Sequence, residues 1–150
     1  MDGIFNLFHQ LIRFETELWN AVDTRLRAEF GLPLSRLEPM QVIARHPSCR
    51  VYDIAEELSI TIGGTSKLVD RIEAAGYCIR RANPDDRRSS IIELTASGRR
   101  VWAKAAKVFE DELQIRIGSA VPERSLQQFY STLVKLRAAN ISADEARSTA

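Results

Sequence analysis

Cysteine and histidine are scarce in this sequence, with two of each among 150 residues. Cys49 and Cys78 are too far apart for a Cys-x-x-Cys motif, and two histidines add too few ligands for a structural zinc site. One pair of cysteines also falls short of the disulfide framework of a small secreted domain. We therefore expect no metal and no other cofactor.

Long apolar runs are absent as well. No run approaches the roughly 18 residues that a membrane span needs, and the amino end lacks the order of a secretory signal. The composition, 45% hydrophobic and 27% charged, is that of an ordinary globular chain. We expect one domain over residues 1–150, a cytoplasmic location and no membrane partner.

Charge of one sign does not dominate, since the net charge is +1, but its distribution is uneven. Residues 1–60 carry 6 Lys or Arg against 9 Asp or Glu, residues 61–104 carry 9 against 5, and residues 105–150 carry 6 of each. A polyanionic partner is therefore expected to bind the middle third.

The first 45 residues predict two helices. Apolar residues recur at steps of three and four over residues 4–30, the pattern of a helix with one buried stripe, which ends at Gly31 and Pro33. The stripe comprises Ile4, Leu7, Phe8, Leu11, Ile12, Leu18, Trp19, Val22, Leu26 and Phe30. Ser35 and Glu38 have the spacing of a capping box for the next helix, with Pro39 in its first turn.

A helix-turn-helix follows. Residues 51–58 predict a short helix that buries Ile54, Ala55 and Leu58, and after Ser59 and Ile60 the residue Thr61 is a good N-cap for a second helix. That helix ends at Gly76, a residue suited to the left-handed C′ position. Its inward side is expected to carry Ile62, Thr65, Leu68, Val69 and Ile72.

After Gly76 the apolar period changes to about two, over residues 77–82 and again over 90–94, which predicts a β-hairpin. Thr95 then caps a long helix that breaks near residues 118–122, and a final helix carries Leu126, Phe129, Tyr130, Leu133 and Leu136. Residues 141–150 lack an apolar stripe and are expected to fray. The fold class is mainly α with a small β-hairpin, a winged helix-turn-helix.

This combination suits DNA, because a helix fills the major groove while a charged hairpin tip reaches the adjacent minor groove. Arg88 or its neighbour Arg87 would enter the minor groove, where the negative potential is strongest. Asp86 would hold the guanidinium of Arg88 in one rotamer by a charge-assisted pair. The plain alternative is a solvated salt bridge in a turn.

The solvent face of the second helix carries further candidates. Ser66, Lys67 and Arg71 suit base edges or phosphates, and the bare backbone of Gly63 and Gly64 permits close approach to a phosphate. The alternative is an ordinary helix surface, with Lys67 and Arg71 paired to Asp70 and Glu73.

The pattern Asp86-x-Arg88-x-x-x-Ile92-x-Leu94-Thr95-x-x-Gly98, preceded by Lys67-Leu-Val-Asp-Arg-Ile-Glu-Ala-Ala-Gly76, resembles the signature of the MarR family of bacterial transcriptional regulators. The resemblance implies a homodimer in which helices from 4–30 and 99–140 of both chains interlock. It implies that winged-helix lobes, residues 34–98, bind pseudo-palindromic double-stranded DNA. The implied recognition region is residues 61–71, including Thr61 and Thr65, and the wing tip is residues 86–88.

The same resemblance implies regulation by a ligand, most simply a repressor released by a small aromatic or phenolic effector. Trp19, Trp102, His9 and His46 are candidates for the effector pocket between the dimer helices and the DNA-binding lobe. Packing in the core or at the surface is the plain alternative. Some members sense oxidants, so Cys78 or Cys49 is a candidate thiol sensor, against the reading of both as small buried hydrophobes.

Two other functions are alternatives to DNA binding. Asp85 and Asp86 are adjacent carboxylates that a hydrolase would use, but two flanking arginines neutralise them and no base or nucleophile accompanies them. We therefore expect no enzyme. A winged helix that contacts proteins instead of DNA stays open.

Overall fold

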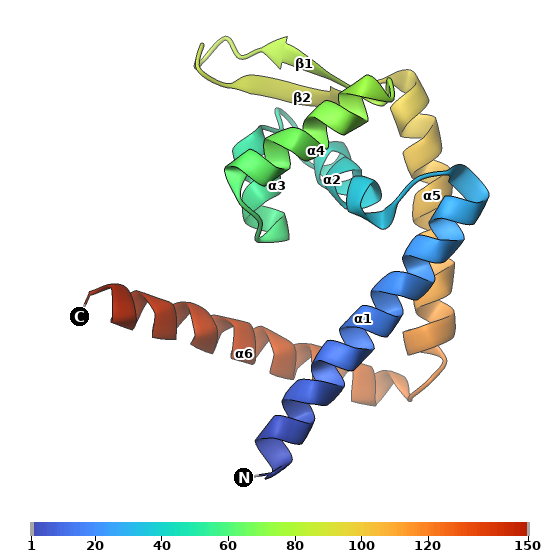
Figure 1. Cartoon of the computed structure of the whole chain (residues 1–150), viewed down its shortest axis with the longest axis vertical. Coiled ribbons are helices and arrows are strands. Elements are labelled where there is room, and N and C mark those ends of the chain that lie inside the picture. The colour runs from blue at the N-terminus through green and yellow to red at the C-terminus, as the bar shows by residue number, and fades with distance from the viewer. Residues whose placement is uncertain (1, 150) are drawn as a thin grey trace. The chain divides into compact units, whose positions relative to one another are not determined.

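The computed structural model describes residues 2–149 as an almost entirely helical chain with one antiparallel hairpin (Figure 1), which confirms the predicted fold class. The elements are α1 (Asp2–Phe30), α2 (Leu34–Arg45), α3 (Val51–Leu58), α4 (Ile62–Ala74), β1 (Cys78–Ala82), β2 (Ser90–Leu94), α5 (Ala96–Leu113), the π-helical turn η1 (Gln114–Gly118) and α6 (Glu123–Ser148). The chain divides into two compact units, Met1–Glu112 and Leu113–Ala150. Within residues 2–149, no helix has the length and apolarity that a membrane crossing requires.

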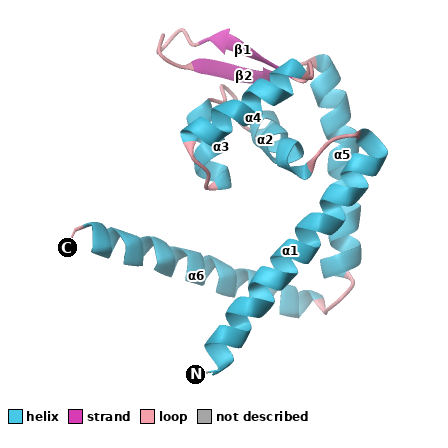
Figure 2. Ribbon diagram, in the orientation of Figure 1, coloured by secondary structure: helices cyan, strands magenta, loops and turns pink. Residues whose placement is uncertain are grey.

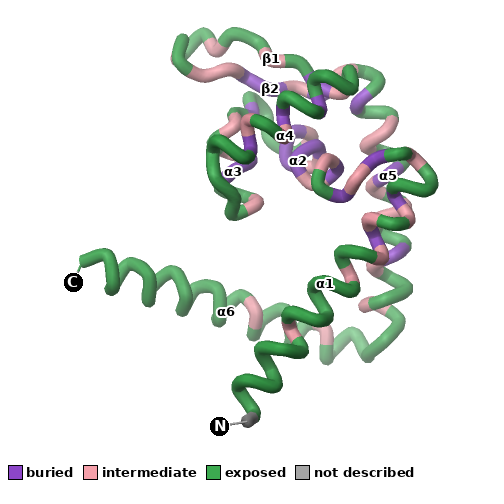
Figure 3. Tube along the Cα trace, viewed as in Figure 1, coloured by how far each residue is buried: buried purple, intermediate pink, exposed green. Residues whose placement is uncertain are grey.

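The core of the first unit lies where α2 packs against α1, α3, α4 and β2. Its fully buried side chains include Leu26, Leu37, Met40, Ile54, Val69, Ile72 and Ile92. Figure 3 shows buried stretches of the trace in α2, α4 and β2. Burying each such side chain contributes about 1.5–3 kcal/mol, so this core gives the winged helix a rigid base.

The expected buried stripe of α1 is only partly correct. Val22 and Leu26 are buried, but Ile4, Phe5 and Phe8 are exposed by 80%, 61% and 56%, and the amino-terminal half of the helix is drawn as exposed in Figure 3. The periodicity identified the helix correctly. Such a pattern marks the apolar face of a helix but does not identify what covers that face.

The predicted capping box at the start of α2 is wrong. The helix begins at Leu34, directly after Pro33, and no side chain of its own segment caps it. Oδ1 of Asp23 on α1 accepts the backbone N–H of Leu34 instead, at 2.8 Å. Pro39 consequently lies in the second turn of the helix, not the first, where its missing N–H removes one helical hydrogen bond.

The helix-turn-helix has the predicted ends. Ser59 closes α3 in the left-handed conformation with φ of 54°, and Gly76 does the same after α4 with φ of 79°. Beyond Gly76, the N–H of Tyr77 donates to the carbonyl of Ile72 at 3.1 Å, which completes a Schellman motif. One inward assignment is wrong: Ile62 is 59% exposed, because it precedes the part of α4 that packs on the core.

The hairpin pairs β1 with β2 in antiparallel register, Cys78 opposite Leu94 and Ala82 opposite Ser90. Cys49, just before α3, forms an isolated antiparallel bridge to Ile92, whose N–H donates to the Cys49 carbonyl at 2.7 Å. Figure 2 shows the two strands beside α4, an arrangement that the contacts between β1 and α4 confirm. The hairpin is therefore held to the helix-turn-helix at more than one place.

The predicted break is confirmed, because η1 ends at Gly118, residues 119–122 are not helical and α6 begins at Glu123. The tail expected to fray is helical through Ser148, so the end of α6 was placed too early. The helix continues beyond the last apolar stripe, because apolar periodicity indicates which helical residues are buried and not where backbone hydrogen bonding ends.

Candidate nucleic-acid interface

The turn between the strands is the wing turn, residues 83–89, and hydrogen bonds from its own side chains stabilise its backbone. Oδ1 of Asn83 accepts the N–H of Asp85 at 3.0 Å, and Oδ1 of Asp86 accepts the N–H of Arg88, also at 3.0 Å. Asn83 Nδ2 also donates to the hydroxyl of Ser89 at 3.0 Å. Asx turns of this kind fix the backbone without a hydrophobic core, so the loop has a defined shape although it lies in solvent.

This backbone directs two cations outward. The Arg88 side chain is 94% exposed, and its Nε lies 3.5 Å from Oδ1 of Asp86. That distance is at the long limit of a hydrogen bond, so Asp86 holds Arg88 mainly through its backbone N–H, and less through the guanidinium than the sequence suggested. Arg87 is also exposed. Both arginines are thus presented at the tip on a fixed turn.

The start of α4 has the expected cap. The Thr61 hydroxyl accepts the N–H of Gly64 at 3.1 Å, which fixes the first turn. Gly63 has open space around the position of an added Cβ, so packing within the chain does not require glycine there. Thr65 is a correction: it is fully buried and its hydroxyl donates to the Thr61 carbonyl at 2.7 Å, so it is unavailable to DNA.

Lys67 and Arg71 lie exposed on α4. The alternative that they pair with Asp70 and Glu73 is wrong, because both carboxylates bind Arg80 of β1. Nη2 of Arg80 lies 2.7 Å from Oδ1 of Asp70, and its Nη1 lies 3.1 Å from Oε1 of Glu73. Between residues 2 and 149, neither Lys67 nor Arg71 has an ion-pair partner. Ser66 is half-buried, and its carbonyl accepts from Arg80 at 3.3 Å.

Arg50 is a surface cation that the sequence did not single out. Its guanidinium lies 5.9 Å from the ring centroid of Tyr52 at the start of α3, and Asp53 accepts its backbone N–H at 2.8 Å. The bridge from Cys49 to Ile92 brings this residue beside the hairpin. The position of Arg50 beside the hairpin follows from the Cys49–Ile92 bridge alone, and no local sequence pattern predicts a bridge of a single residue pair.

Both cysteine thiols are buried. Burial, with a smaller effect of Asp53 and Glu57, raises the pKa of Cys49 to about 12. Burial, with a smaller effect of Glu73, raises the pKa of Cys78 to about 11, although Arg80 acts in the opposite direction. A thiolate is the reactive form, so this environment opposes thiol sensing.

The effector candidates do not line one cavity. Trp19 lines a hollow of about 250 Å³ with Glu15, Thr16 and Asn20. His46 lines a different one of the same size, where its Nε2 lies 2.7 Å from Oε2 of Glu57. His9 is exposed and its ring meets Phe8 edge-on. Trp102 is half-buried, and its Nε1 is a buried donor with no acceptor in the part of the chain that the structure describes.

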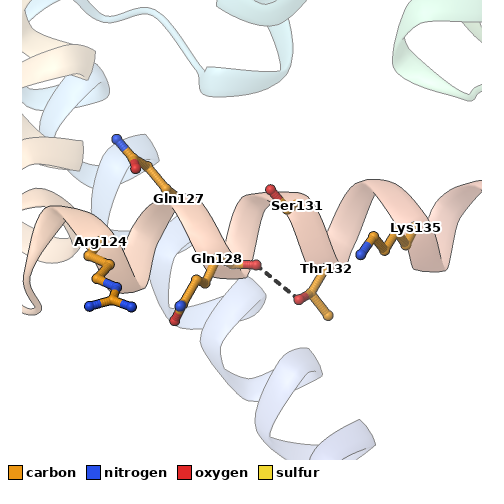
Figure 4. Close-up of a pocket in the computed structure, with 6 residues that line it drawn as sticks. All are labelled: Arg124, Gln127, Gln128, Ser131, Thr132 and Lys135. Carbon is orange, nitrogen blue, oxygen red and sulfur yellow. Dashed lines mark hydrogen bonds between the residues drawn. The ribbon is translucent and has the colours of Figure 1, made fainter.

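A larger hollow of about 640 Å³ lies along α6 in the second unit. Six polar side chains line it, all from that one helix: Arg124, Gln127, Gln128, Ser131, Thr132 and Lys135 (Figure 4). The close-up shows them side by side along the helix, with the Thr132 hydroxyl donating to the Gln128 carbonyl at 2.9 Å. Because one convex helix supplies every lining residue, this surface is the polar face of α6 and no enclosed site.

Residues 32–90, which hold α2, α3, α4, β1 and the wing turn, match the family model described as MarR family. This segment is similar to the winged-helix domain of the MarR family. MarR family transcriptional regulators are DNA-binding proteins without enzymatic activity, so this similarity gives no support to a hydrolase that uses Asp85 and Asp86. No group of three or more His, Cys, Asp or Glu side chains among residues 2–149 is placed to hold a metal ion.

A curated relative is the uncharacterized HTH-type transcriptional regulator YfiV of Bacillus subtilis (strain 168), 27% identical over 49% of this chain and 46% of YfiV. The match thus spans about half the length of that relative.

Solved MarR family structures share the fold. Sco3205 of Streptomyces coelicolor, in complex with DNA, superposes with a TM-score of 0.85 and 21% identity over 93% of this chain and 88% of its own. CouR of Rhodococcus jostii RHA1, bound to p-coumaroyl-CoA, gives a TM-score of 0.78 and 21% identity over 87% and 90%.

Proposed function

We propose that this protein is a sequence-specific DNA-binding transcriptional regulator of the MarR family, with α4 in the major groove and the wing turn in the adjacent minor groove. The observation that carries the proposal is the set of unpaired or weakly held cations on these two elements: Lys67, Arg71, Arg87 and Arg88 are all exposed. Thr61, Gly63, Gly64 and Ser66 complete the proposed contact set. Sco3205, which has the same fold, is in complex with DNA.

The regulator acts as a homodimer, in which residues 4–30 and 99–140 form the dimerisation helices and residues 34–98 form the winged-helix lobe. Two uncovered apolar surfaces support this. On α1, the side chains of Ile4, Phe5 and Phe8 are exposed. On α6, the side chains of Phe129, Tyr130 and Leu136 are exposed. Apolar surfaces of this extent mark sites of protein association.

Dimerisation also supplies the symmetry that DNA recognition uses. Two copies related by a twofold axis place two α4 helices on half-sites centred about 10 bp apart, so the operator is pseudo-palindromic. A regulator of this kind works where the chromosome lies, which agrees with the expected cytoplasmic location.

A small aromatic or phenolic effector releases the protein from DNA, so that it acts as a repressor. The buried, unsatisfied Nε1 of Trp102 supports a ligand acceptor near α5, because an unpaired buried donor is costly. CouR, of the same fold, is bound to the phenolic thioester p-coumaroyl-CoA. A ligand that binds better when the two α4 helices are wrongly spaced shifts the population away from DNA.

Selection of bound duplexes from a random DNA pool tests the DNA-binding proposal. We expect enrichment of a pseudo-palindrome, with affinity that falls steeply as salt rises because phosphate contacts release counterions. If low-salt selection enriches nothing, the alternative of a winged helix that contacts proteins replaces the proposal.

A fluorescence titration with phenolic carboxylates and their thioesters tests the effector. Trp102→Phe is expected to abolish the response, while Trp19→Phe and His46→Ala separate the contributions of the two other candidates. A response that persists without Trp102 would move the effector site elsewhere, and no response in the wild type would remove the effector from the proposal.

A further inference from the structure

Arg80 differs from the other arginines of the hairpin. Its side chain is 24% exposed, against 59% for Arg81 and 94% for Arg88. Its backbone N–H donates to Oε2 of Glu73 at 3.1 Å, and its guanidinium reaches both Glu73 and Asp70. The guanidinium donates a third hydrogen bond, from Nη2 to the Ser66 carbonyl at 3.3 Å. This side chain is directed at α4 and away from solvent.

The three acceptors form one line on the helix. Ser66, Asp70 and Glu73 follow at helical steps of four and three, so they share one face of α4. One residue of β1 therefore spans two turns of the helix. Together with the bridge from Cys49 to Ile92, it attaches both strands of the hairpin to the helix-turn-helix.

From these contacts we infer that Arg80 is a positioning residue for DNA binding, which fixes the hairpin on α4 and occupies the carboxylates that would otherwise repel phosphates. The inference rests on the proposed DNA-binding function. Arg80 itself touches no base or phosphate in this account. It acts through α4 and through the wing.

The electrostatic part concerns Asp70. Its side chain is 63% exposed, and it lies between Lys67 and Arg71 on the helix proposed to enter the major groove. An unpaired carboxylate there opposes a polyanion, and the opposition grows when the complex excludes water. The pair with Arg80 cancels that charge while leaving Lys67 and Arg71 without acidic partners.

The mechanical part concerns spacing. A helix in the major groove and a turn in the minor groove bind one duplex only when their separation fits both grooves. A hairpin held at a fixed place on α4 loses less conformational freedom on binding than a loose one, and this preorganisation raises affinity.

A double-mutant cycle on operator affinity tests the electrostatic part. We expect Arg80→Ala to weaken binding roughly tenfold. Asp70→Asn is expected to recover at least about fivefold in the Arg80→Ala background and to have a clearly smaller effect in the wild type, since only the unpaired carboxylate repels strongly. Equal effects of Asp70→Asn in both backgrounds would overturn the inference, because a direct DNA contact or a general folding role of Arg80 gives no such coupling.

Arg81→Ala is the matched control. It removes the same charge from the next residue of β1, but Arg81 bonds to Glu93 within the hairpin and not to α4. No coupling to Asp70 is expected for it. A coupling of the same size would assign the effect to the net charge of the strand and would contradict a role specific to Arg80.

Amide hydrogen exchange on the free protein tests the mechanical part without DNA. Arg80→Ala is expected to speed exchange at residues 78–94 relative to the helix-turn-helix core, while Arg81→Ala leaves it close to the wild type. Unchanged exchange in Arg80→Ala would overturn the inference that Arg80 fixes the hairpin on α4. Failure of the wild type to bind any selected duplex would instead refute the DNA-binding proposal, so the two failures are distinguishable.

Discussion

The carboxylate of Asp23 on α1 accepts the backbone N–H of Leu34, the first residue of α2, at 2.8 Å. Its other oxygen lies 2.7 Å from Nε of Arg27, one turn later on α1. The helix cap of α2 thus comes from the preceding helix, and one side chain joins the long α1 to the base of the winged-helix lobe.

Asp23→Ala is expected to lower the free energy of unfolding by about 1–2 kcal/mol, the usual cost of losing an N-cap acceptor. Asp23→Asn keeps an oxygen for the N–H of Leu34 and is expected to lose less. Chemical denaturation measures both, and Glu110→Ala on α5 removes the same charge from an exposed position as a control. Equal stability of Asp23→Ala and the control would show that the cap contributes nothing.

The same contact predicts a dependence on acid. Partial burial acts to raise the pKa of Asp23, but the hydrogen bond from Leu34 and the pair with Arg27 outweigh it, so the net pKa lies below the ordinary 3.8. A carboxylate whose pKa is lowered by folding stabilises the fold at pH values above its pKa in the unfolded chain. That stabilisation is lost as pH falls through the folded pKa. The stability difference between wild type and Asp23→Asn should therefore shrink below about pH 4.

Two glycines offer opposite predictions. At Gly98 an added Cβ would lie 2.0 Å from the carbonyl oxygen of Tyr77, whereas at Gly63 it would meet nothing within 4 Å. Gly98→Ala is expected to destabilise the fold by about 1–3 kcal/mol through overpacking. Gly63→Ala is expected to leave stability unchanged or slightly raised, since alanine favours a helix, yet to weaken operator binding if the backbone approaches a phosphate there.

Thermal melting and operator affinity, measured on the same two variants, separate these effects. Wild-type affinity in Gly63→Ala would remove Gly63 from the proposed contact set. Wild-type stability in Gly98→Ala would contradict the close packing of α5 on the turn after α4.

The cysteines predict resistance to oxidants. With the pKa of Cys49 at about 12 and that of Cys78 at about 11, the thiolate fraction at neutral pH is very small. Peroxide at neutral pH is expected to leave operator affinity unchanged, and thiol reagents should react slowly until the protein unfolds. The raised pKa of Cys49 means that the fold favours the protonated thiol. This preference stabilises the fold below the ordinary thiol pKa of 9.0, and the stabilisation is lost as pH rises toward the folded pKa of about 12. Loss of DNA binding after peroxide treatment, absent when both cysteines are serine, would restore the redox alternative.

Arg88→Ala is expected to weaken operator binding by about 1–3 kcal/mol, with fold and oligomeric state unchanged. The side chain makes few contacts within the chain, so its loss acts on the complex. Arg147→Ala, at the last turn of α6, removes the same charge outside the winged-helix lobe and serves as the control. Equal affinities of the two variants in a gel-shift assay would refute the wing assignment.

The sequence predicted local structure well. The helix-turn-helix, the cap at Thr61, the turn at Gly76 and the existence of the hairpin all follow from periodicity and turn chemistry over a few residues. The capping role of Asp23 was not predicted, because its partner Leu34 lies 11 residues away on another helix. A capping box at Ser35 was the nearest local pattern. Such partners depend on how helices meet, which local rules do not encode.

The candidate site shows the same division. Spacing placed Lys67 and Arg71 on the solvent face of α4, where they lie. The same spacing assigned Asp70 and Glu73 to them, whereas the structure gives both acids to Arg80 across the hairpin. Thr65 was assigned to DNA as part of a region, although its burial at 0% exposure excludes contact.

In the proposed complex, α4 and the wing turn of two copies bind one duplex. Amide exchange of the selected protein–DNA complex, combined with its mass, tests this most directly. The account predicts two chains per duplex and new protection concentrated at residues 61–71 and 83–89. One chain per duplex, or protection confined to other segments, would contradict it.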